Sequence, residues 1–183
     1  MSETEHPIKH VAAGVTAGLG APSIRVGGYL VTVARLPALL RLPPHAHENA
    51  TVNVVLDGHY QERLGNGPLQ AHGPATLIAK PPGMVHMNQV GSMATECLVV
   101  EVNADVALRF HTLVHRSSHV ARCGGQLRAE LVRMDNLSPL RIENLVIELL
   151  DEVSGSPSRA SDMENRGLIR RVICCTTSRE RIP

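Results

Sequence analysis

Between residues 23 and 102, short segments rich in Val, Thr, Leu and Ile alternate with Gly, Pro and Asn. This pattern is typical of an all-β region, because β-branched residues suit strands and Gly, Pro and Asn suit turns. We expect strands over 29–36, 51–56, 59–64, 75–80, 85–89 and 95–102. Asp57-Gly58 predicts a tight antiparallel hairpin, and Pro81-Pro82-Gly83 predicts a corner. So many short strands predict a small barrel or jelly roll.

After Asn103 the apolar residues take the spacing of helices. One helix face is expected at Val106, Phe110, Leu113 and Val114, and a second at Leu127, Leu131 and Met134. A third helix over 138–153 carries the clearest stripe, formed by Ile142, Leu145, Val146, Leu149, Leu150 and Val153. This stripe is wider than a helix needs to cover one side of a small barrel. We therefore expect it to form a homodimer interface across a twofold axis.

These patterns predict a mainly β fold with C-terminal helices. The expected regions are an N-terminal extension (1–22), a β-barrel (23–103), a helical dimerisation region (104–153) and a C-terminal region (154–183). The last begins as a linker rich in Ser, Pro and charged residues and contains a final helical segment over 167–177.

Composition limits the classes of partner. The chain has 18 basic and 17 acidic residues, so its net charge of +1 gives no general attraction to nucleic acid or anionic lipid. No apolar run is long enough to span a bilayer, and the acidic N-terminus does not suit a signal peptide. The four cysteines lack metal-ribbon and CxxC spacing, which favours reduced thiols and a cytoplasmic location.

Three histidines are the strongest candidates for chemistry. On an extended chain His45 and His47 face the same side, and His86 follows the Pro81-Pro82-Gly83 corner. Three neutral imidazoles around an open position suit a divalent transition metal such as Zn, Fe, Ni or Cu. Two alternatives remain open: histidines hydrogen-bonded inside a barrel, or histidines that line a pocket for an organic ligand.

The His-x-His pair, Gly58 and the Pro-x-Gly-x-x-His run that ends at His86 resemble the paired motifs of the cupin superfamily. The resemblance implies a cupin-like jelly-roll barrel with His45, His47 and His86 as metal ligands. Metal-binding cupins usually have Glu four residues after the second His, where this chain has Thr51. Thr51 is therefore expected beside the three histidines in a ligand-binding site.

A closer resemblance covers nearly the whole chain. The sequences at 43–48, 54–62, 80–86 and 97–102 resemble the sensor domain of AraC-type transcriptional regulators. The sequence at 127–145 resembles the helices that follow the barrel in that family, and the one at 168–173 resembles the segment that leads into the DNA-binding domain. The resemblance implies a non-enzymatic domain that binds a small-molecule effector and forms a homodimer. It also implies that 154–183 holds the linker and the truncated start of a DNA-binding domain, and that DNA is contacted only through a helix-turn-helix domain that would begin beyond Pro183.

The leading hypothesis is thus the ligand-sensing and dimerisation domain of an AraC-type regulator, without membrane contact. One rival is a metal-dependent cupin enzyme of the dioxygenase or isomerase type that uses His45, His47 and His86. Another is a stand-alone cupin that inhibits full-length relatives through mixed dimers.

A second histidine series, His111, His115 and His119, recurs every four residues. This spacing predicts one shared helix face. The series lacks the Glu of the zinc-protease motif, so we expect solvated positions.

Overall fold

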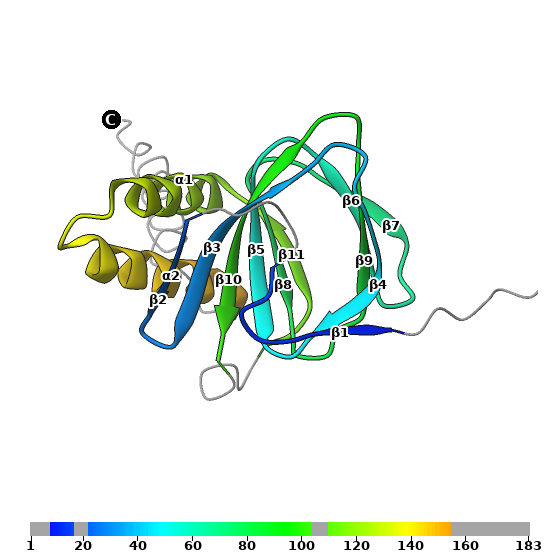
Figure 1. The fold of residues 1–183 in the computed structure, drawn as a ribbon, viewed down its shortest axis with the longest axis horizontal. Coiled ribbons are helices and arrows are strands. Elements are labelled where there is room, and N and C mark those ends of the chain that lie inside the picture. Colours follow the sequence, from blue (N-terminus) through cyan, green and yellow to red (C-terminus); the bar gives the residue numbers. More distant parts are fainter. Residues whose placement is uncertain (1–7, 17–21, 104–109, 155–183) are drawn as a thin grey trace, which may run out of the picture.

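The computed structural model describes residues 8–16, 22–103 and 110–154. A five-stranded sheet has the order β1 (Lys9–Val11), β4 (Arg41–His47), β9 (His86–Val90), β6 (Tyr60–Leu64) and β7 (Leu69–His72). A six-stranded sheet has the order β11 (Leu113–Arg116), β8 (Thr76–Lys80), β5 (Ala50–Asp57), β10 (Thr95–Val102), β3 (Tyr29–Leu36) and β2 (Ser23–Val26). Helices α1 (Ser118–Arg133) and α2 (Ser138–Ser154) lie on the outer side of the six-stranded sheet (Figure 1).

The six-stranded sheet is buried on both faces. Its outer face packs on the helices in a core that includes Val31, Val52, Leu98, Leu127 and Leu149. Its inner face packs inside the barrel in a second core that includes Ala34, Val55, Tyr60, Ile78 and Val99. Because side chains alternate along a strand, neighbouring residues of β5 and β10 serve different cores. The barrel interior and the helix-covered face therefore share one wall.

The predicted mainly β class, a cupin-like jelly-roll barrel followed by helices, is confirmed by this arrangement. Strands β3 and β10 have the predicted bounds and pair with each other along their whole length. The predicted third helix corresponds to α2, and Leu127 and Leu131 lie on the buried face of α1.

The hairpin predicted at Asp57-Gly58 is wrong. Strand β5 belongs to the six-stranded sheet and β6 to the other, so the chain crosses between sheets at this point. Gly58 has φ +76°, and a Cβ there would lie 2.5 Å from the carbonyl oxygen of Ala94. The Asp-Gly pair marks a sharp change of direction, and the partners of the two strands are set by the cores on which they pack.

The prediction of a first helix is also wrong for those of its residues that the structure describes. Leu113 and Val114 belong to β11, an edge strand that pairs antiparallel with β8. Phe110 and Leu113 pack against the outer core, whereas Val114 is 40% exposed. Val106 lies outside the described residues, as do the linker and the final helical segment expected after residue 154.

The apolar stripe of α2 packs within its own chain. Ile142, Val146, Leu149 and Val153 are at most 2% exposed, in the core between the helices and the sheet. Leu145 and Leu150 are partly buried against the same core. The prediction that these residues form a dimer interface is therefore wrong for the four fully buried positions, because they have almost no exposed surface for a partner to contact. The homodimer itself stays a prediction.

The expected N-terminal extension contributes to the barrel. Strand β1 pairs in parallel with β4, and the backbone of Gly14 donates to the buried carboxylate of Glu101 over 2.8 and 3.1 Å. In the part of the chain that is described, no helix is long and apolar enough to cross a membrane.

Candidate metal centre

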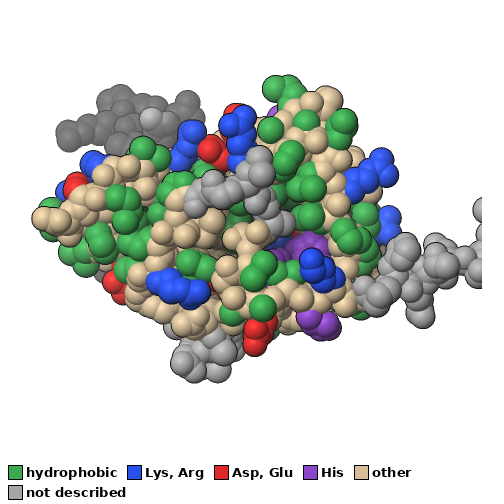
Figure 2. Space-filling model, in the orientation of Figure 1, with side chains coloured by type: hydrophobic (Ala, Val, Ile, Leu, Met, Phe, Trp, Pro, Cys, Tyr) green, Lys and Arg blue, Asp and Glu red, His purple; other side chains and the backbone are tan. Residues whose placement is uncertain are grey.

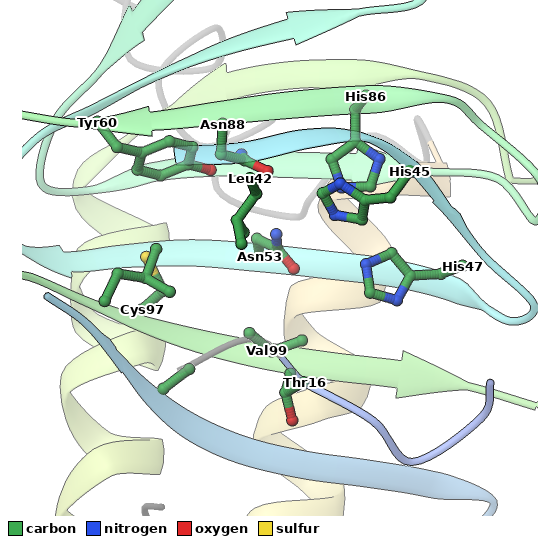
Figure 3. Close-up of a pocket in the computed structure, with 12 residues that line it drawn as sticks. Thr16, Leu42, His45, His47, Asn53, Tyr60, His86, Asn88, Cys97 and Val99 are labelled. Carbon is green, nitrogen blue, oxygen red and sulfur yellow. The ribbon is translucent and has the colours of Figure 1, made fainter. Parts of the chain in front are cut away.

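Two neighbouring strands bring the three predicted histidines together. His45 and His47 lie on β4, and His86 at the start of β9 is the register partner of His45. The ring centroids are 4.1 Å apart for His45 and His86, and 5.3–5.4 Å apart for the two pairs that include His47. One nitrogen from each ring lies within 4.8 Å of the other two. Figure 3 shows the three imidazoles gathered at one end of a cavity.

Backbone carbonyls orient two of the rings. His45 Nδ1 lies 2.8 Å from the carbonyl oxygen of Pro43, and His86 Nδ1 lies 3.1 Å from that of Met84. A carbonyl oxygen only accepts, so each Nδ1 carries the proton and donates. The lone pair is then on Nε2, the arrangement seen in metal-ligating histidines.

Burial keeps the histidines neutral. Removal from water lowers the pKa of His47 to about 4. Burial also lowers the pKa values of His45 and His86, and the nearby Lys80 ammonium lowers them further. Neutral imidazole is the form that binds a metal, so the three rings are ready to ligate at neutral pH.

Buried polar atoms without a hydrogen-bond partner, one of them on a histidine ring, support the binding of a metal ion here. Within the described part of the chain, His47 Nδ1, Thr51 Oγ1 and Asn53 Oδ1 are buried without a hydrogen-bond partner. Buried polar groups normally have one, and such exceptions mark places where an ion or water completes the site. The donor set and its orphaned nitrogen therefore fit a divalent transition metal.

The cavity that the rings border is small. Its volume is about 50 Å³, and its polar lining includes Asn53, Tyr60 and Asn88. Tyr60 and Cys97 lie at the end away from the histidines (Figure 3). Histidine side chains are visible in an opening on the molecular surface in Figure 2. Such a space suits a group of a few heavy atoms, whereas pockets for drug-sized ligands are about 300–1,000 Å³.

The structure places Thr51 differently from the sequence prediction. Thr51 lies on the barrel side of β5, buried to 1% exposure. The cavity is instead lined by Asn53, two residues further along the same face. Of the four predicted ligand-binding residues, His45, His47 and His86 thus line the cavity and Thr51 does not.

A buried ion pair lies next to the histidines and was not predicted from the sequence. Lys80 Nζ donates to Glu62 Oε1 over 2.9 Å, and both side chains are at most 2% exposed. Glu62 Oε1 is also 3.9 Å from His86 Nε2, and Tyr60 donates its hydroxyl proton to the other oxygen over 3.4 Å. The carboxylate therefore links the histidine end of the barrel to Lys80 and Tyr60.

One sequence signal does point to this pair. Tyr60, Glu62 and Leu64 alternate with exposed residues in β6, so period two places Glu62 on an apolar face. A charged residue at such a position is rarely buried without a partner. The identity of that partner depends on the packing of β8 across the barrel.

A β-barrel that gathers three neutral histidines beside a small polar cavity defines a candidate metal-binding barrel. No family model and no curated protein matches the chain. Many solved structures are similar to it at low identity, and three of them illustrate the likeness. For a single-residue variant of oxalate decarboxylase (Bacillus subtilis), identity is 18% and TM-score 0.39, over 43% of this chain and 22% of that one.

The DMSP lyase DddQ from Ruegeria pomeroyi DSS-3 is 21% identical with a TM-score of 0.40, over 47% of this chain and 42% of that one. The Schizosaccharomyces pombe Cnp3 cupin domain is 15% identical with a TM-score of 0.41, over 45% of this chain and 63% of that one. In each case the match spans less than two thirds of the other protein. Likenesses this distant do not identify an activity, which has to be inferred from the chain's own side chains.

Proposed function

We propose that this chain holds a divalent transition metal at His45, His47 and His86 and acts on a small substrate, as a cupin-type enzyme of the dioxygenase or isomerase type. The observation that supports this most is the convergence of three neutral, buried imidazoles, two of them fixed by backbone carbonyls. A metal bound there supplies Lewis acidity or redox chemistry at an open coordination position.

The surrounding side chains have distinct tasks in this proposal. The carbonyls of Pro43 and Met84 keep His45 and His86 in the tautomer that presents Nε2. Asn53 and Asn88 orient the substrate through their amides, and the apolar wall formed by Val99 excludes water. The Lys80 ammonium, held in place by Glu62, opposes protonation of the neighbouring rings and so keeps their nitrogens free for a ligand.

The size of the cavity narrows the substrate class. A volume of about 50 Å³ accepts a substrate end of a few heavy atoms, such as a carboxylate or a ketone oxygen. This is the reason to prefer a small substrate over a large regulatory ligand.

Metal content tests the proposal. Purified protein is dialysed in turn against Zn²⁺, Fe²⁺, Ni²⁺ and Cu²⁺ and analysed by plasma mass spectrometry. We expect His45→Ala with His47→Ala to lose one equivalent of metal. His10→Ala with His59→Ala, at two exposed positions, is the matched control and should retain it. Equal metal content in both double variants would refute the proposal, and oxygen uptake with small acids and ketones would separate dioxygenase from isomerase chemistry.

The sensor of an AraC-type regulator is the second candidate. One observation favours it: α1 and α2 share a core with the barrel wall, so a ligand-induced change in that wall can reach the helices. In this case a small ligand should alter self-association of the chain in sedimentation, with no turnover. Assembly with a full-length relative would favour the inhibitory variant of the same hypothesis.

A further inference from the structure

A second group of metal-binding side chains lies outside the barrel, between β11, α1 and α2. His119 and Cys123 are four residues apart on α1, and Glu148 and Glu152 are four residues apart on α2. This spacing puts each pair on one helix face. His119, Cys123 and Glu148 each offer one ligand atom within 4.8 Å of the other two.

We propose that this cluster is a zinc site that fastens α1 to α2. The ligands are His119 Nε2, Cys123 Sγ and a Glu148 oxygen, and Glu152 provides the fourth. Zinc in proteins is bound by this mixture of imidazole, thiolate and carboxylate in tetrahedral geometry. Side chains on facing helices build metal sites in helical bundles, and two ligands at i and i+4 share one face of a helix.

The spacing of the atoms agrees with one ion between them. His119 Nε2 is 3.5 Å from Cys123 Sγ, and that sulfur is 3.6 Å from Glu148 Oε2. With Zn–S of about 2.3 Å and Zn–N or Zn–O of about 2.0–2.2 Å, tetrahedral angles separate such atoms by about 3.5 Å. Small side-chain rotations are enough to bring the atoms onto one cation.

Glu152 lies at the open side of this cluster. Its Oε1 is 3.9 Å from His119 Nε2, and its Oε2 is 3.1 Å from His115 Nε2 on β11. His115 thereby orients the carboxylate from outside the cluster. A thiolate, two carboxylates and the Arg122 cation together balance the charge of a doubly charged ion.

Without a metal ion, protons on His119 and Cys123 connect the side chains of the cluster. Arg122 Nη2 donates to His119 Nδ1 over 3.1 Å, and since arginine has no acceptor, Nε2 carries the histidine proton. Nε2–H points to Sγ, and the thiol donates to Glu148. Zinc binding transfers the histidine proton from Nε2 to Nδ1 and releases the thiol proton to solvent, so one proton leaves per ion.

Arg122 opposes binding in two ways. It holds His119 in the wrong tautomer for ligation, and it donates to Glu148 Oε2 over 2.8 Å. Removing the guanidinium frees both ligands. Two opposite effects are therefore expected. Substitution of a ligand residue should weaken zinc binding, and Arg122→Gln should strengthen it.

Cobalt(II) tests the site, because a thiolate bound to Co²⁺ gives a near-ultraviolet charge-transfer band. Chelator-treated full-length protein is titrated with Co²⁺, and Zn²⁺ is then added to displace it. We expect the band in the wild type and in Cys97→Ser, and its loss in Cys123→Ser. His119→Ala and Glu148→Gln, at partly exposed positions, should weaken Co²⁺ binding by at least about tenfold.

Several results would overturn the proposal. These are a wild type without the band, a band that survives Cys123→Ser, or a band that depends on Cys97, Cys174 or Cys175. Co²⁺ affinity that does not rise in Arg122→Gln also contradicts it. If Cys123→Ser fails to fold by circular dichroism, His119→Ala and Glu148→Gln decide the question.

The helix site can be tested independently of the proposed metal site in the barrel. In a His45→Ala, His47→Ala background the sulfur band should persist with the barrel ligands removed. Loss of the band in that background, with an intact fold, would place the thiolate-bound ion in the barrel and refute the helix site.

Discussion

At the scale of single residues, the barrel interior combines groups that water would normally surround. Lys80 and Glu62 form a buried ion pair, and Tyr60, Cys97 and three histidines lie in the same interior. Each is held in the form that burial allows: neutral imidazoles, a protonated thiol, a protonated phenol and a paired charge. Changing one member therefore changes the environment of its neighbours.

Lys80→Met tests the ion pair. The substitution leaves the Glu62 carboxylate buried without its cation, so we expect the free energy of unfolding to fall by about 3–5 kcal/mol in urea denaturation. Adding Glu62→Gln to Lys80→Met should recover part of this loss, because no charge is then stranded. Arg63→Met, at an exposed position next to Glu62 on β6, is the control and should stay within about 0.5 kcal/mol of wild type.

Cys97 provides a pH test. Burial raises the pKa of its thiol to about 12, from 9.0 for a free cysteine. Between these values the unfolded chain has lost the proton and the folded chain keeps it, so stability falls as pH rises from about 9 to about 12. The slope approaches about 1.4 kcal/mol per pH unit.

Urea denaturation at pH 8 and pH 10 measures this slope in wild type and Cys97→Ser. The serine variant should lose less stability between the two pH values, since its hydroxyl does not titrate there. An equal loss in both proteins would show that Cys97 contributes nothing to the alkaline slope.

At the scale of elements, α1 approaches the barrel wall closely at one glycine. A Cβ on Gly124 would lie 3.0 Å from side-chain carbons of both Val54 and Leu56 on β5. The neighbouring Gly125 faces away from the sheet, with no atom within 4 Å of its Cβ position. The two glycines differ in packing and share the same helical backbone.

This pair gives a matched prediction. Gly125→Ala should stabilise the protein by about 0.5–1 kcal/mol, because alanine loses less backbone entropy in a helix. Gly124→Ala has the same entropic advantage, but its Cβ must displace side chains of β5. It should therefore be less stable than Gly125→Ala. Thermal unfolding of both variants checks the difference. Equal stabilisation would show that the Val54 and Leu56 side chains on β5 move aside at no cost in free energy.

At the scale of the whole molecule, the N-terminal strand supports the histidine strand. Strand β1 pairs with β4 from Lys9 opposite His45 to Val11 opposite His47. Without β1, β4 becomes the edge of the five-stranded sheet and exposes its backbone groups. The geometry of the histidine cluster therefore depends on residues 36 positions earlier in the chain, since Lys9 pairs with His45.

Two truncations test this support. Removal of residues 1–11 deletes β1, and we expect faster amide hydrogen exchange in β4 and weaker Zn²⁺ binding by the barrel histidines. Removal of residues 1–7 leaves β1 in place and is the control. If both truncations behave alike, β1 does not position His45 and His47.

The sequence predicts well those features that depend on local spacing. The strand-favouring composition of 29–36 and 95–102 predicts β3 and β10, and the i, i+2 relation of His45 and His47 predicts that these two rings face the same side of β4. Features that depend on distant packing escape it. The crossing at Asp57-Gly58, the Glu62–Lys80 pair and the His119–Cys123–Glu148 cluster each require knowledge of which elements face one another.

The pairing of β3 with β10 also matters while the chain is being synthesised. Leu36 pairs with Thr95, so the full inner edge of β3 has to wait for a segment made roughly sixty residues later, about 3–12 s at ordinary translation speeds. During that interval an eight-residue apolar strand has only the short β2 beside it. Closing so long a loop is slow, so the unpaired edge of β3 stays open to wrong pairing for as long as synthesis of the barrel takes.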